Sequence, residues 1–362
     1  MLKSILLKLT GLYKYNNNLI IRFNQKLSTA PIIKDAKGIM FGFARNFFFS
    51  VTIRPKYSNQ INYLSQCDNS KFGIILQGTI NDQKKFLIET LKIYKKIFKN
   101  SYIVVSTWKD EIKYKKDIVP LCDHIIFNEK PKQSGIANVN LQLKSTYSAL
   151  IHLKKKKIRY SLKSRTDCRI YNPDSLNFLY NLIKLFPVNI KNNLNVKSRI
   201  LFCSSFSCKY KIYGVTDILL FSTTDELLKY FYYDCFFKGI KKLEIKNKDY
   251  LKKNTYVVAE TYLCASYLRR VKVKLSWTMS QWEEMLKNVF CIFDAHSVDF
   301  LWNKYERNFE QRRNINYSFY DNRGISFSDW LAIYKSKRKR LNSKLQEKWK
   351  IKNGKVVKSS YF

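Results

Sequence analysis

The chain has 362 residues, of which 46% are hydrophobic and 15% aromatic. That much apolar surface offsets the conformational entropy lost on folding and excludes an intrinsically disordered protein. Its 67 Lys and Arg residues against 27 Asp and Glu give a formal net charge of +40, which favours anionic partners: phosphorylated substrates, nucleic acids or anionic lipid surfaces.

Eight cysteines and three histidines are spread along the chain, and this distribution favours reduced thiols, as in a cytosolic protein, over a disulfide framework or a structural zinc site. The first ten residues include Lys3 and Lys8, which leave too short an apolar run for a secretory signal peptide. No run of about 18 apolar residues is present to span a bilayer. We therefore expect a cytoplasmic protein.

From residue 72 onward, short apolar runs that suit buried strands alternate with segments of helical periodicity. The first half predicts a strand at 72–77, a helix that Asp82 caps and that ends near 98, strands at 102–106 and 122–127, a helix at 138–153 and a strand at 158–162. The second half predicts a helix after Pro173, strands at 200–204 and 217–222, a helix that Thr224 caps, a helix that begins near Glu260, and a basic helical tail at 335–352. This order is typical of an α/β protein with a mainly parallel central sheet flanked by helices.

The same patterns divide the chain into three parts. Residues 1–70 form a lead-in with no assigned structure, residues 71–330 form the main α/β domain, and residues 331–362 form a basic C-terminal tail. A single core of this size with terminal extensions agrees with the length at which hydrophobic cores stop growing, roughly 250 to 300 residues.

Polar clusters follow three of the predicted strands, namely Gln77-Gly78-Thr79, Ser106-Thr107-Trp108 and Lys163-Ser164-Arg165-Thr166-Asp167. In open α/β sheets, ligands bind beyond the carboxyl ends of the strands, where loops and helix N-termini present backbone amides to anions. Each cluster alone also fits ordinary loop chemistry. Their joint placement at strand ends predicts one binding site at this edge of the sheet.

Two features narrow the kind of ligand. Gly78 would let the backbone approach a nucleotide closely, but the chain lacks both G-x-G-x-x-G and G-x-x-x-x-G-K-[ST], which disfavours dinucleotide enzymes and P-loop kinases. Trp108 has two interpretations: it stacks on a base or sugar, or it closes the core at the end of its strand.

Two acids are candidates for chemistry. Asp167 ends a strand among Lys163, Arg165 and Arg169, where it could hold a divalent cation while the arginines neutralise a departing diphosphate; the alternative is a structural ion pair between Arg165 and Asp167. Glu260 could act as a general base on a hydroxyl, or it could be a first-turn carboxylate that the helix dipole favours.

The segments Gly73–Gly78, Ile103–Trp108, Asn138–Thr146 and Lys163–Asp167 resemble, in order and spacing, motifs of the WavE family of lipopolysaccharide-synthesis proteins. The resemblance covers roughly residues 72–330 and includes softer matches at 259–263, 302–305 and 328–330, although Ala259 stands where the family pattern suggests proline. It implies a GT-A-like nucleotide-diphospho-sugar transferase fold and a role in assembling lipopolysaccharide core or a related surface glycan.

By this resemblance, Gln77 and Thr107 would border the nucleotide, Asn138, Asn140 and Gln142 would line the cleft, and Arg165 with Asp167 would face the diphosphate. The predicted nucleotide-sugar-binding residues are therefore Gln77, Gly78, Thr79, Thr107, Trp108, Asn138, Asn140, Gln142, Lys163 and Arg165, and the predicted catalytic residues are Glu260 and Asp167. Asp167 is also the candidate ligand for Mn²⁺ or Mg²⁺. The segment supplies one acid rather than the two of a D-x-D motif, so metal dependence stays open.

The leading hypothesis is a glycosyltransferase that moves a sugar from a nucleotide-sugar donor to a hydroxyl of a glycan or lipid-linked glycan acceptor. The alternative is a non-catalytic basic protein that binds membranes or nucleic acid, but no motif that reads RNA or DNA supports a specific nucleic-acid partner. Basic residues of the tail, Lys335, Lys337, Arg338, Lys339 and Arg340, would hold the protein peripherally on anionic lipid at the cytoplasmic face of the inner membrane.

Overall fold

The computed structural model describes residues 54–63, 67–188, 194–232, 259–305, 324–341, 348–352 and 355–359. Its strands are β1 (Phe72–Gln77), β2 (Tyr102–Trp108), β3 (His124–Asn128), β4 (Tyr160–Arg165), β5 (Cys168–Ile170), β6 (Ile200–Cys203), β7 (Leu220–Thr223), β8 (Phe290–Phe293), β9 (Phe300–Trp302), β10 (Lys348–Lys352) and β11 (Lys355–Ser359). Its α-helices are α4 (Lys84–Ile97), α5 (Lys115–Ile118), α6 (Val139–Lys155), α7 (Ser175–Leu185), α8 (Thr224–Tyr230), α11 (Ala259–Arg270), α12 (Met279–Asn288) and α14 (Phe327–Lys335).

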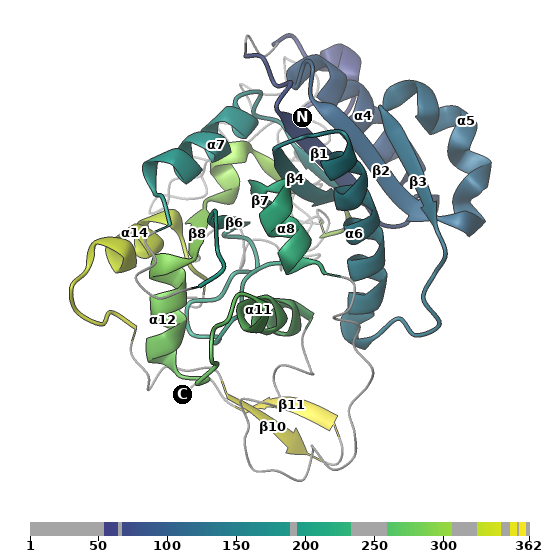
Figure 1. Cartoon of the computed structure of the whole chain (residues 1–362). Coiled ribbons are helices and arrows are strands. Elements are labelled where there is room, and N and C mark those ends of the chain that lie inside the picture. The colour runs from purple at the N-terminus through teal and green to yellow at the C-terminus, as the bar shows by residue number, and fades with distance from the viewer. Residues whose placement is uncertain are drawn as a thin grey trace, which may run out of the picture.

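A seven-stranded sheet in the order β3-β2-β1-β4-β7-β6-β8 forms the centre of the molecule (Figure 1). Four of its six pairings are parallel, between β1 and β2, β1 and β4, β2 and β3, and β6 and β8. Strand β7 is antiparallel to both of its neighbours, β4 and β6. The predicted α/β fold with a mainly parallel central sheet flanked by helices is therefore confirmed.

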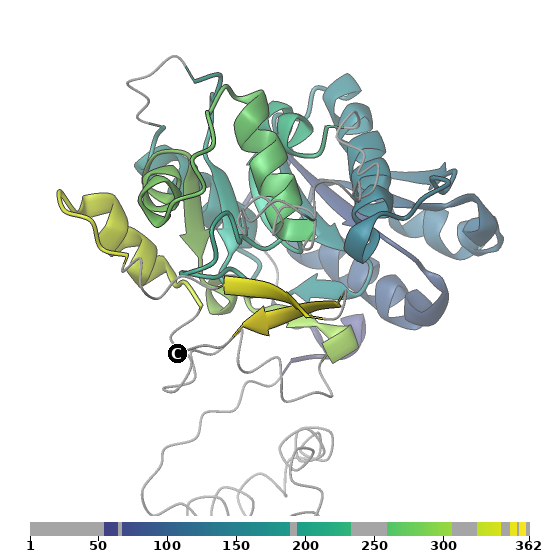
Figure 2. The same cartoon turned by 90° about the horizontal axis from the view of Figure 1, so that it is seen from below.

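Helices cover both faces of this sheet. Helix α6 packs along β1 and β2 and against α8, and both helices lie on the front face in Figure 1. Helix α4 lies behind the sheet, where Tyr94 accepts a hydrogen bond from the backbone of Ile170 in the small β5–β9 ribbon, 3.0 Å away. Seen from below, in Figure 2, the sheet lies between these two layers. This three-layer arrangement leaves the strand ends as the place where loops meet.

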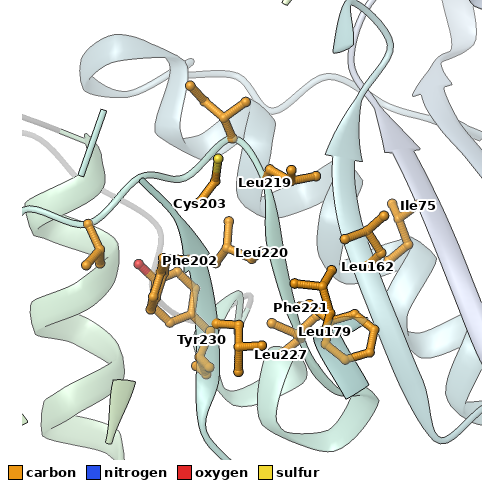
Figure 3. Close-up of a cluster of buried hydrophobic side chains, with 14 of the residues drawn as sticks. Ile75, Leu162, Leu179, Phe202, Cys203, Leu219, Leu220, Phe221, Leu227 and Tyr230 are labelled. Atoms are coloured by element: carbon orange, nitrogen blue, oxygen red, sulfur yellow. The ribbon is translucent and has the colours of Figure 1, made fainter. Parts of the chain in front are cut away.

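Hydrophobic side chains fill the space between the sheet and the helices on both of its faces (Figure 3). Leu162 and Phe221 from neighbouring strands, Leu227 from α8 and Leu179 from α7 are all fully buried there. Each such side chain contributes about 1.5–3 kcal/mol relative to an exposed position. The continuous apolar runs that predict these strands reflect burial on both faces, as parallel sheets require.

Two predicted helix caps are corrected by the structure. Helix α4 begins at Lys84 with Gln83 at the N-cap position, because Asp82 belongs to a preceding 3-10 turn (Asn81–Gln83). Helix α8 is capped by Thr223, whose side chain accepts a hydrogen bond from the backbone of Glu226 at 3.3 Å. Thr224 is the first helical residue, since its own hydroxyl is turned to Ile158 and Ser161 in β4 and the segment before it.

The expectation of a basic helical tail at 335–352 is wrong. Helix α14 ends at Lys335, residues 336–341 have no regular structure, and β10 pairs with β11 in an antiparallel hairpin. Apolar and basic residues alternate with a period of two in the sequence Lys-Trp-Lys-Ile-Lys of β10, and Asn-Gly follows at 353–354, a dipeptide strongly preferred between hairpin strands. Helix α14 also spans the expected boundary between residues 330 and 331.

Residues 1–53 of the expected lead-in lie outside the described residues. The part that follows is joined to the main body, because the guanidinium of Arg169 donates to the backbone carbonyls of Pro55 and Lys56, and Ser58 donates to Glu89. Arg169 also binds Thr90 and Phe86 of α4 and is 1% exposed. It therefore serves the packing of α4 and does not face a diphosphate.

No helix in the described ranges combines the length and the apolar character that a membrane span needs.

Candidate functional site

The ends of three parallel strands meet at one edge of the sheet. The register places Gln77 of β1 beside both Ser106 of β2 and Arg165 of β4. The three polar clusters found in the sequence are thus adjacent in space, as the strand-end argument predicts. In Figure 1 this edge faces α11.

The loop after β1 has a backbone that glycine allows. Gly78 has φ +129°, and a Cβ there would lie 3.0 Å from the hydroxyl of Thr166. That hydroxyl donates to the backbone oxygen of Thr79, 2.7 Å away, and the side chain of Thr79 is exposed. Gln77 itself is buried and accepts a hydrogen bond from Ser145 of α6. The exposed part of this loop is therefore the segment 78–79.

Glu111, which the sequence did not single out, fixes the next residues of this loop. One carboxylate oxygen accepts the backbone amides of Ile80 and Asn81, at 2.8 and 2.9 Å, and the other accepts the hydroxyl of Thr107. Glu111 is 5% exposed. Thr107 is fully buried, and its hydroxyl is hydrogen-bonded to Glu111. Its side chain therefore helps to hold the loop after β1 in place.

Trp108 is 2% exposed, which leaves no ring face for a base or sugar to stack on. Its strand neighbour Asn128 donates to the backbone oxygen of Thr107 and to the hydroxyl of Ser106, both at 2.9 Å. Of the two roles considered for Trp108, the structure therefore supports the one in which it closes the core at the end of β2.

Arg165 and Asp167 form a bidentate ion pair. The guanidinium donates Nε to Oδ1 at 2.8 Å and Nη2 to Oδ2 at 2.9 Å, and the indole of Trp302 donates to Oδ2 at 2.9 Å. Burial alone would raise the pKa of Asp167, but the hydrogen bonds from Arg165 and Trp302 lower it below its ordinary value. This is the structural ion pair that the sequence left as the alternative role of Asp167.

Asp167 fits a metal ligand poorly. Its Oδ1 also accepts from the Cys168 thiol, at 3.6 Å, so four donors already surround the carboxylate. Within the part of the chain that the structure describes, no group of three or more His, Cys, Asp or Glu side chains could hold a metal ion. The geometry supports no step through Mn²⁺ or Mg²⁺ at this position.

Lys163 is fully buried at the end of β4, where its Nζ donates to the backbone oxygen of Asp217. Burial lowers its pKa to about 8, and the charge of Asp217 opposes this shift. The same carbonyl accepts Nε2 of Gln142 at 2.9 Å. Lys163 and Gln142 thus fix the backbone at Asp217, and Arg165, whose side chain is 31% exposed, is the accessible cation of β4.

Glu260 lies in the first turn of α11, as the sequence predicts. Burial raises its pKa above the ordinary value, the charge of Asp217 raises it further, and Lys211 opposes the rise. A carboxyl group with a raised pKa is suited to accept a proton near neutral pH. The role of Glu260 as a general base stays a prediction, and the direction of its pKa shift agrees with that role.

The three amides predicted to line the cleft, Asn138, Asn140 and Gln142, differ in what they do. Asn138 begins α6 with φ +62° and is exposed, in a short turn (Ile136–Asn138) that contacts α11. Asn140 is buried and donates to the backbone of Gln133 at 3.1 Å. Of these three, only Asn138 has an exposed side chain, in a turn that contacts the helix containing Glu260.

The structure brings together Gln77, Gly78, Thr79, Lys163, Arg165 and, across the edge, Glu260. It adds Glu111, Asp217 and Trp302, which sequence reasoning missed. Asp217 stood at the expected start of the strand 217–222, but β7 begins at Leu220, so Asp217 lies in the preceding loop. Because β7 is antiparallel to β4, this loop lies at the carboxyl end of β4.

Comparison with known proteins identifies a family for the chain. The family model for WavE lipopolysaccharide synthesis matches residues 73–360. None of the curated proteins compared with the chain matches it. Among solved structures, the crystal structure of mouse xyloside xylosyltransferase 1 in its apo form is 8% identical, with a TM-score of 0.28, over 62% of this chain and 84% of that chain. The family match extends over most of the sequence and includes every strand of the central sheet, and on that ground the chain belongs to the WavE lipopolysaccharide synthesis family.

Proposed function

We propose that this protein is a glycosyltransferase of GT-A-like fold that transfers a sugar from a nucleotide-sugar donor to a hydroxyl of a lipopolysaccharide or related surface glycan. The observation that carries the proposal is a partly exposed cation, Arg165, at the carboxyl end of β4, together with an acid of raised pKa, Glu260, in the helix that this sheet edge faces. Arg165 ends β4, and Glu260 lies in the first turn of α11, which contacts the turn before α6. Membership of the WavE family supports the same activity.

Arg165 is the residue proposed to meet the donor diphosphate. Asp167 engages Nε and Nη2, and the guanidinium lies 5.3 Å from the centre of the Trp302 ring. Nη1 and the second N–H of Nη2 point elsewhere and can donate to phosphate oxygens. The amide of Gly78 donates to the backbone oxygen of Ser106, so the exposed residue Thr79 is the one in this loop proposed to contact the donor. Under this proposal Asp167 acts by orienting Arg165.

Glu260 is the proposed general base. It would take the proton of the acceptor hydroxyl while the nucleoside diphosphate leaves from the anomeric carbon, and a base so placed suits inversion. Asn138, exposed at the start of α6 and next to α11, is the proposed polar contact for the acceptor. Attachment to the cytoplasmic face of the membrane through the basic segment after α14 completes the proposal.

The test combines binding and turnover. Purified protein would be heated with UDP-, GDP-, CMP- and ADP-sugars, with and without manganese, and one nucleotide class is expected to raise the melting temperature. Arg165→Gln should lose this shift. Glu260→Gln should keep it but lower transfer about 100-fold or more. Glu284→Gln, an exposed acid on α12, is the matched control. A folded protein that responds to no nucleotide sugar would contradict the proposal.

A further inference from the structure

The loop after β6 lies at the same sheet edge as Arg165. Strands β4 and β6 are each antiparallel to β7, so they run in the same direction and their carboxyl ends meet at one edge of the sheet. Only β7 lies between them, which places the two strands about 10 Å apart. Phe206, shortly after the end of β6, is partly exposed in this loop. It is therefore a partly exposed aromatic residue at the edge that holds the candidate site.

Trp302 connects Phe206 to Arg165. Its ring packs edge-to-face against the ring of Phe206, with the centroids 5.0 Å apart and the planes at 75°. The guanidinium of Arg165 lies 5.3 Å from the centre of the Trp302 ring. The hydrogen bond from the indole to Asp167 fixes the position of Trp302. Arg165, Trp302 and Phe206 thus form a continuous row, with a cation at one end and a partly exposed ring at the other.

The backbone of Phe206 adopts a conformation that phenylalanine rarely takes. Its φ is +65°, in the left-handed region, where the Cβ of an L-residue crowds the backbone and glycine or asparagine is favoured. Packing in the core alone does not account for an aromatic residue here, because the side chain is only partly buried. Strained backbone of this kind persists where the surrounding structure imposes it, and it clusters at ligand sites. The backbone therefore points to a role for the exposed part of the ring.

Two serines hold the turn on either side of Phe206. The amide of Ser204 donates to the backbone at the end of β8 at 2.8 Å. The hydroxyl of Ser207 donates to the carbonyl of the last residue of β6 at 2.7 Å and accepts the amide of Thr216 at 3.0 Å. The carbonyl of Ser207 accepts the amide of Ile325 at 3.2 Å. A hydrogen-bonded turn thus presents Phe206, so its ring needs little ordering when a ligand binds.

The order of the strands identifies the part of a nucleotide sugar that would meet this ring. Along the sheet, β1 is followed by β4, β7 and β6. Thr79 follows β1 and Arg165 ends β4, so a donor with its nucleoside over β1 and its diphosphate at Arg165 directs its sugar toward β7 and β6. One face of a pyranose ring is lined by C–H bonds, which complement the negatively polarised face of an aromatic ring. A sugar ring is thus the group that fits Phe206.

We infer that Phe206 is a sugar-binding residue that stacks on a pyranose ring at the transfer centre, and that Trp302 sets its position relative to Arg165. The inference rests on the proposed function and adds a contact beyond the diphosphate and the general base. The pyranose is the donor sugar or the terminal sugar of the acceptor, since both present a C–H face. Two experiments distinguish these sources.

The first experiment isolates the donor sugar. Melting temperatures would be measured for the wild type, Phe206→Leu and Phe206→Tyr with UDP, GDP, CMP and ADP and with the matching nucleotide sugars. Leucine keeps an apolar side chain and the same backbone strain but has no aromatic face, whereas tyrosine keeps that face. If the ring binds the donor sugar, Phe206→Leu should keep the shift with the bare nucleotide and bind the nucleotide sugar about threefold more weakly or worse, and Phe206→Tyr should bind it as the wild type does.

The second experiment isolates the acceptor. Saturation-transfer NMR would be recorded on the oligosaccharide of the lipopolysaccharide core with the same three proteins, in the absence of any nucleotide. If the ring binds the acceptor sugar, the C–H protons of one sugar face should receive the strongest saturation in the wild type and in Phe206→Tyr. Phe206→Leu should bind the oligosaccharide about threefold more weakly or worse.

Phe178→Leu is the matched control for both experiments. Phe178 is a partly exposed phenylalanine of α7, and its neighbour Asn177 donates at 3.3 Å to Asn69, which precedes β1 at the opposite edge of the sheet. This variant should bind both ligands as the wild type does. Ligand binding that Phe206→Leu leaves unchanged in both experiments would overturn the inference. Loss of the shift with the bare nucleotide would also overturn it, because the ring would then contact the base.

The inference and the proposed function can fail separately. Sugar binding that depends on Phe206 but leads to no transfer would count against the proposed function alone. Transfer at the wild-type rate and affinity in Phe206→Leu would count against the inference alone. A folded wild-type protein that binds neither the nucleotide sugars nor the oligosaccharide would contradict both.

Discussion

The indole of Trp302 donates a hydrogen bond of 2.9 Å to the carboxylate of Asp167, a residue 135 positions earlier in the chain. Trp302 ends β9, which pairs with β5 directly after Asp167, and the backbone amide of Asn303 donates to the carbonyl of Asp167 at 2.9 Å. The β5–β9 ribbon thus fixes Asp167 from two sides, and Asp167 in turn fixes Arg165. Asp167, a candidate catalytic acid in the sequence analysis, therefore holds the guanidinium of Arg165 in place.

Removing the indole donor should weaken this support. Trp302→Phe is expected to lower the free energy of unfolding by about 1.5–3 kcal/mol, the usual contribution of a hydrogen bond to a charged group. Because the pKa of Asp167 is lowered in the fold, the loss should be present at neutral pH and shrink as pH falls through that lowered pKa. Urea denaturation against pH measures it. A loss that is the same at all pH values would mean that the indole acts only by packing.

Glu111 gives a second prediction. Glu111→Ala removes the acceptor of the backbone amides of Ile80 and Asn81 and of the Thr107 hydroxyl, and it should cost about 1–3 kcal/mol for the buried amide of Ile80 left without a partner. The loop after β1 should also become more mobile, so hydrogen exchange at Ile80 should speed up. Asp110→Ala, an exposed neighbour paired with Lys130, is the control. Unchanged exchange at Ile80 would show that the loop is held by other contacts.

The rings of His124 and His152 stack where β3 begins, at the other end of the strands from the candidate site. This pair predicts that the stability of the protein depends on pH. Their centroids lie 3.8 Å apart, and Tyr102 contacts His152 at 3.1 Å. Burial and the nearby charge of Lys156 lower the pKa of both histidines. The unfolded chain therefore takes up more protons as pH falls below about 6.5, and the melting temperature should fall with it.

His152→Gln should flatten this fall between about pH 7 and pH 5, because the second charge is no longer added to the pair. Differential scanning fluorimetry across that range measures the slope. His296→Gln, a change at an exposed histidine, should leave the slope as it is in the wild type. A slope insensitive to His152→Gln would assign the acid sensitivity to carboxyl groups.

The basic segment after α14 predicts membrane binding. Lys337, Arg338 and Lys339 are exposed, and Glu283 holds the end of the segment by accepting the backbone amides of Arg340 and Leu341 at 2.7 and 2.9 Å. Changing the three exposed residues to Gln should weaken binding to anionic vesicles by about 3 kcal/mol, roughly a hundredfold.

The matched control for this prediction is the triple change to Gln of Lys113, Lys115 and Lys116, which are equally exposed but lie beside β3. Vesicle sedimentation with neutral and anionic lipid separates charge from other effects. If the two triple variants lose affinity equally, attraction comes from the net charge of the whole protein and the segment has no special part in it.

Much of the fold could be predicted from the sequence, since buried parallel strands leave continuous apolar runs. The expected strand at 72–77 coincides with β1, and the helix at 138–153 lies within one or two residues of α6. The direction of β7 could not be predicted, because an antiparallel buried strand has the same apolar run as a parallel one. The hairpin β10–β11 was missed although its alternation and its Asn-Gly connection were present in the sequence.

The candidate site was predicted in part. Strand ends identified Gln77, Arg165 and Asp167, because their position follows from the sheet alone. The sequence does not show that the carboxylate of Asp167 accepts hydrogen bonds from Arg165 and Trp302. Nor does it show that the charge of Asp217 acts on Glu260. These relationships depend on segments that only the tertiary fold brings together. The burial of Thr107 and Trp108 could not be predicted either, because a strand-end position does not reveal whether a side chain faces the core.

Strand β7 runs antiparallel to its neighbours, and it divides the candidate site into two parts that come from different stretches of the sequence. On the near side of β7, the residues proposed for the donor belong to one continuous stretch, 77–165, that ends with β4. On the far side, Asp217 and Glu260 belong to later segments, before β7 and in α11. Under the proposed function, exchanging the chain after β5 between two members of the family is expected to change the acceptor, while the choice of nucleotide stays with β1, β2 and β4.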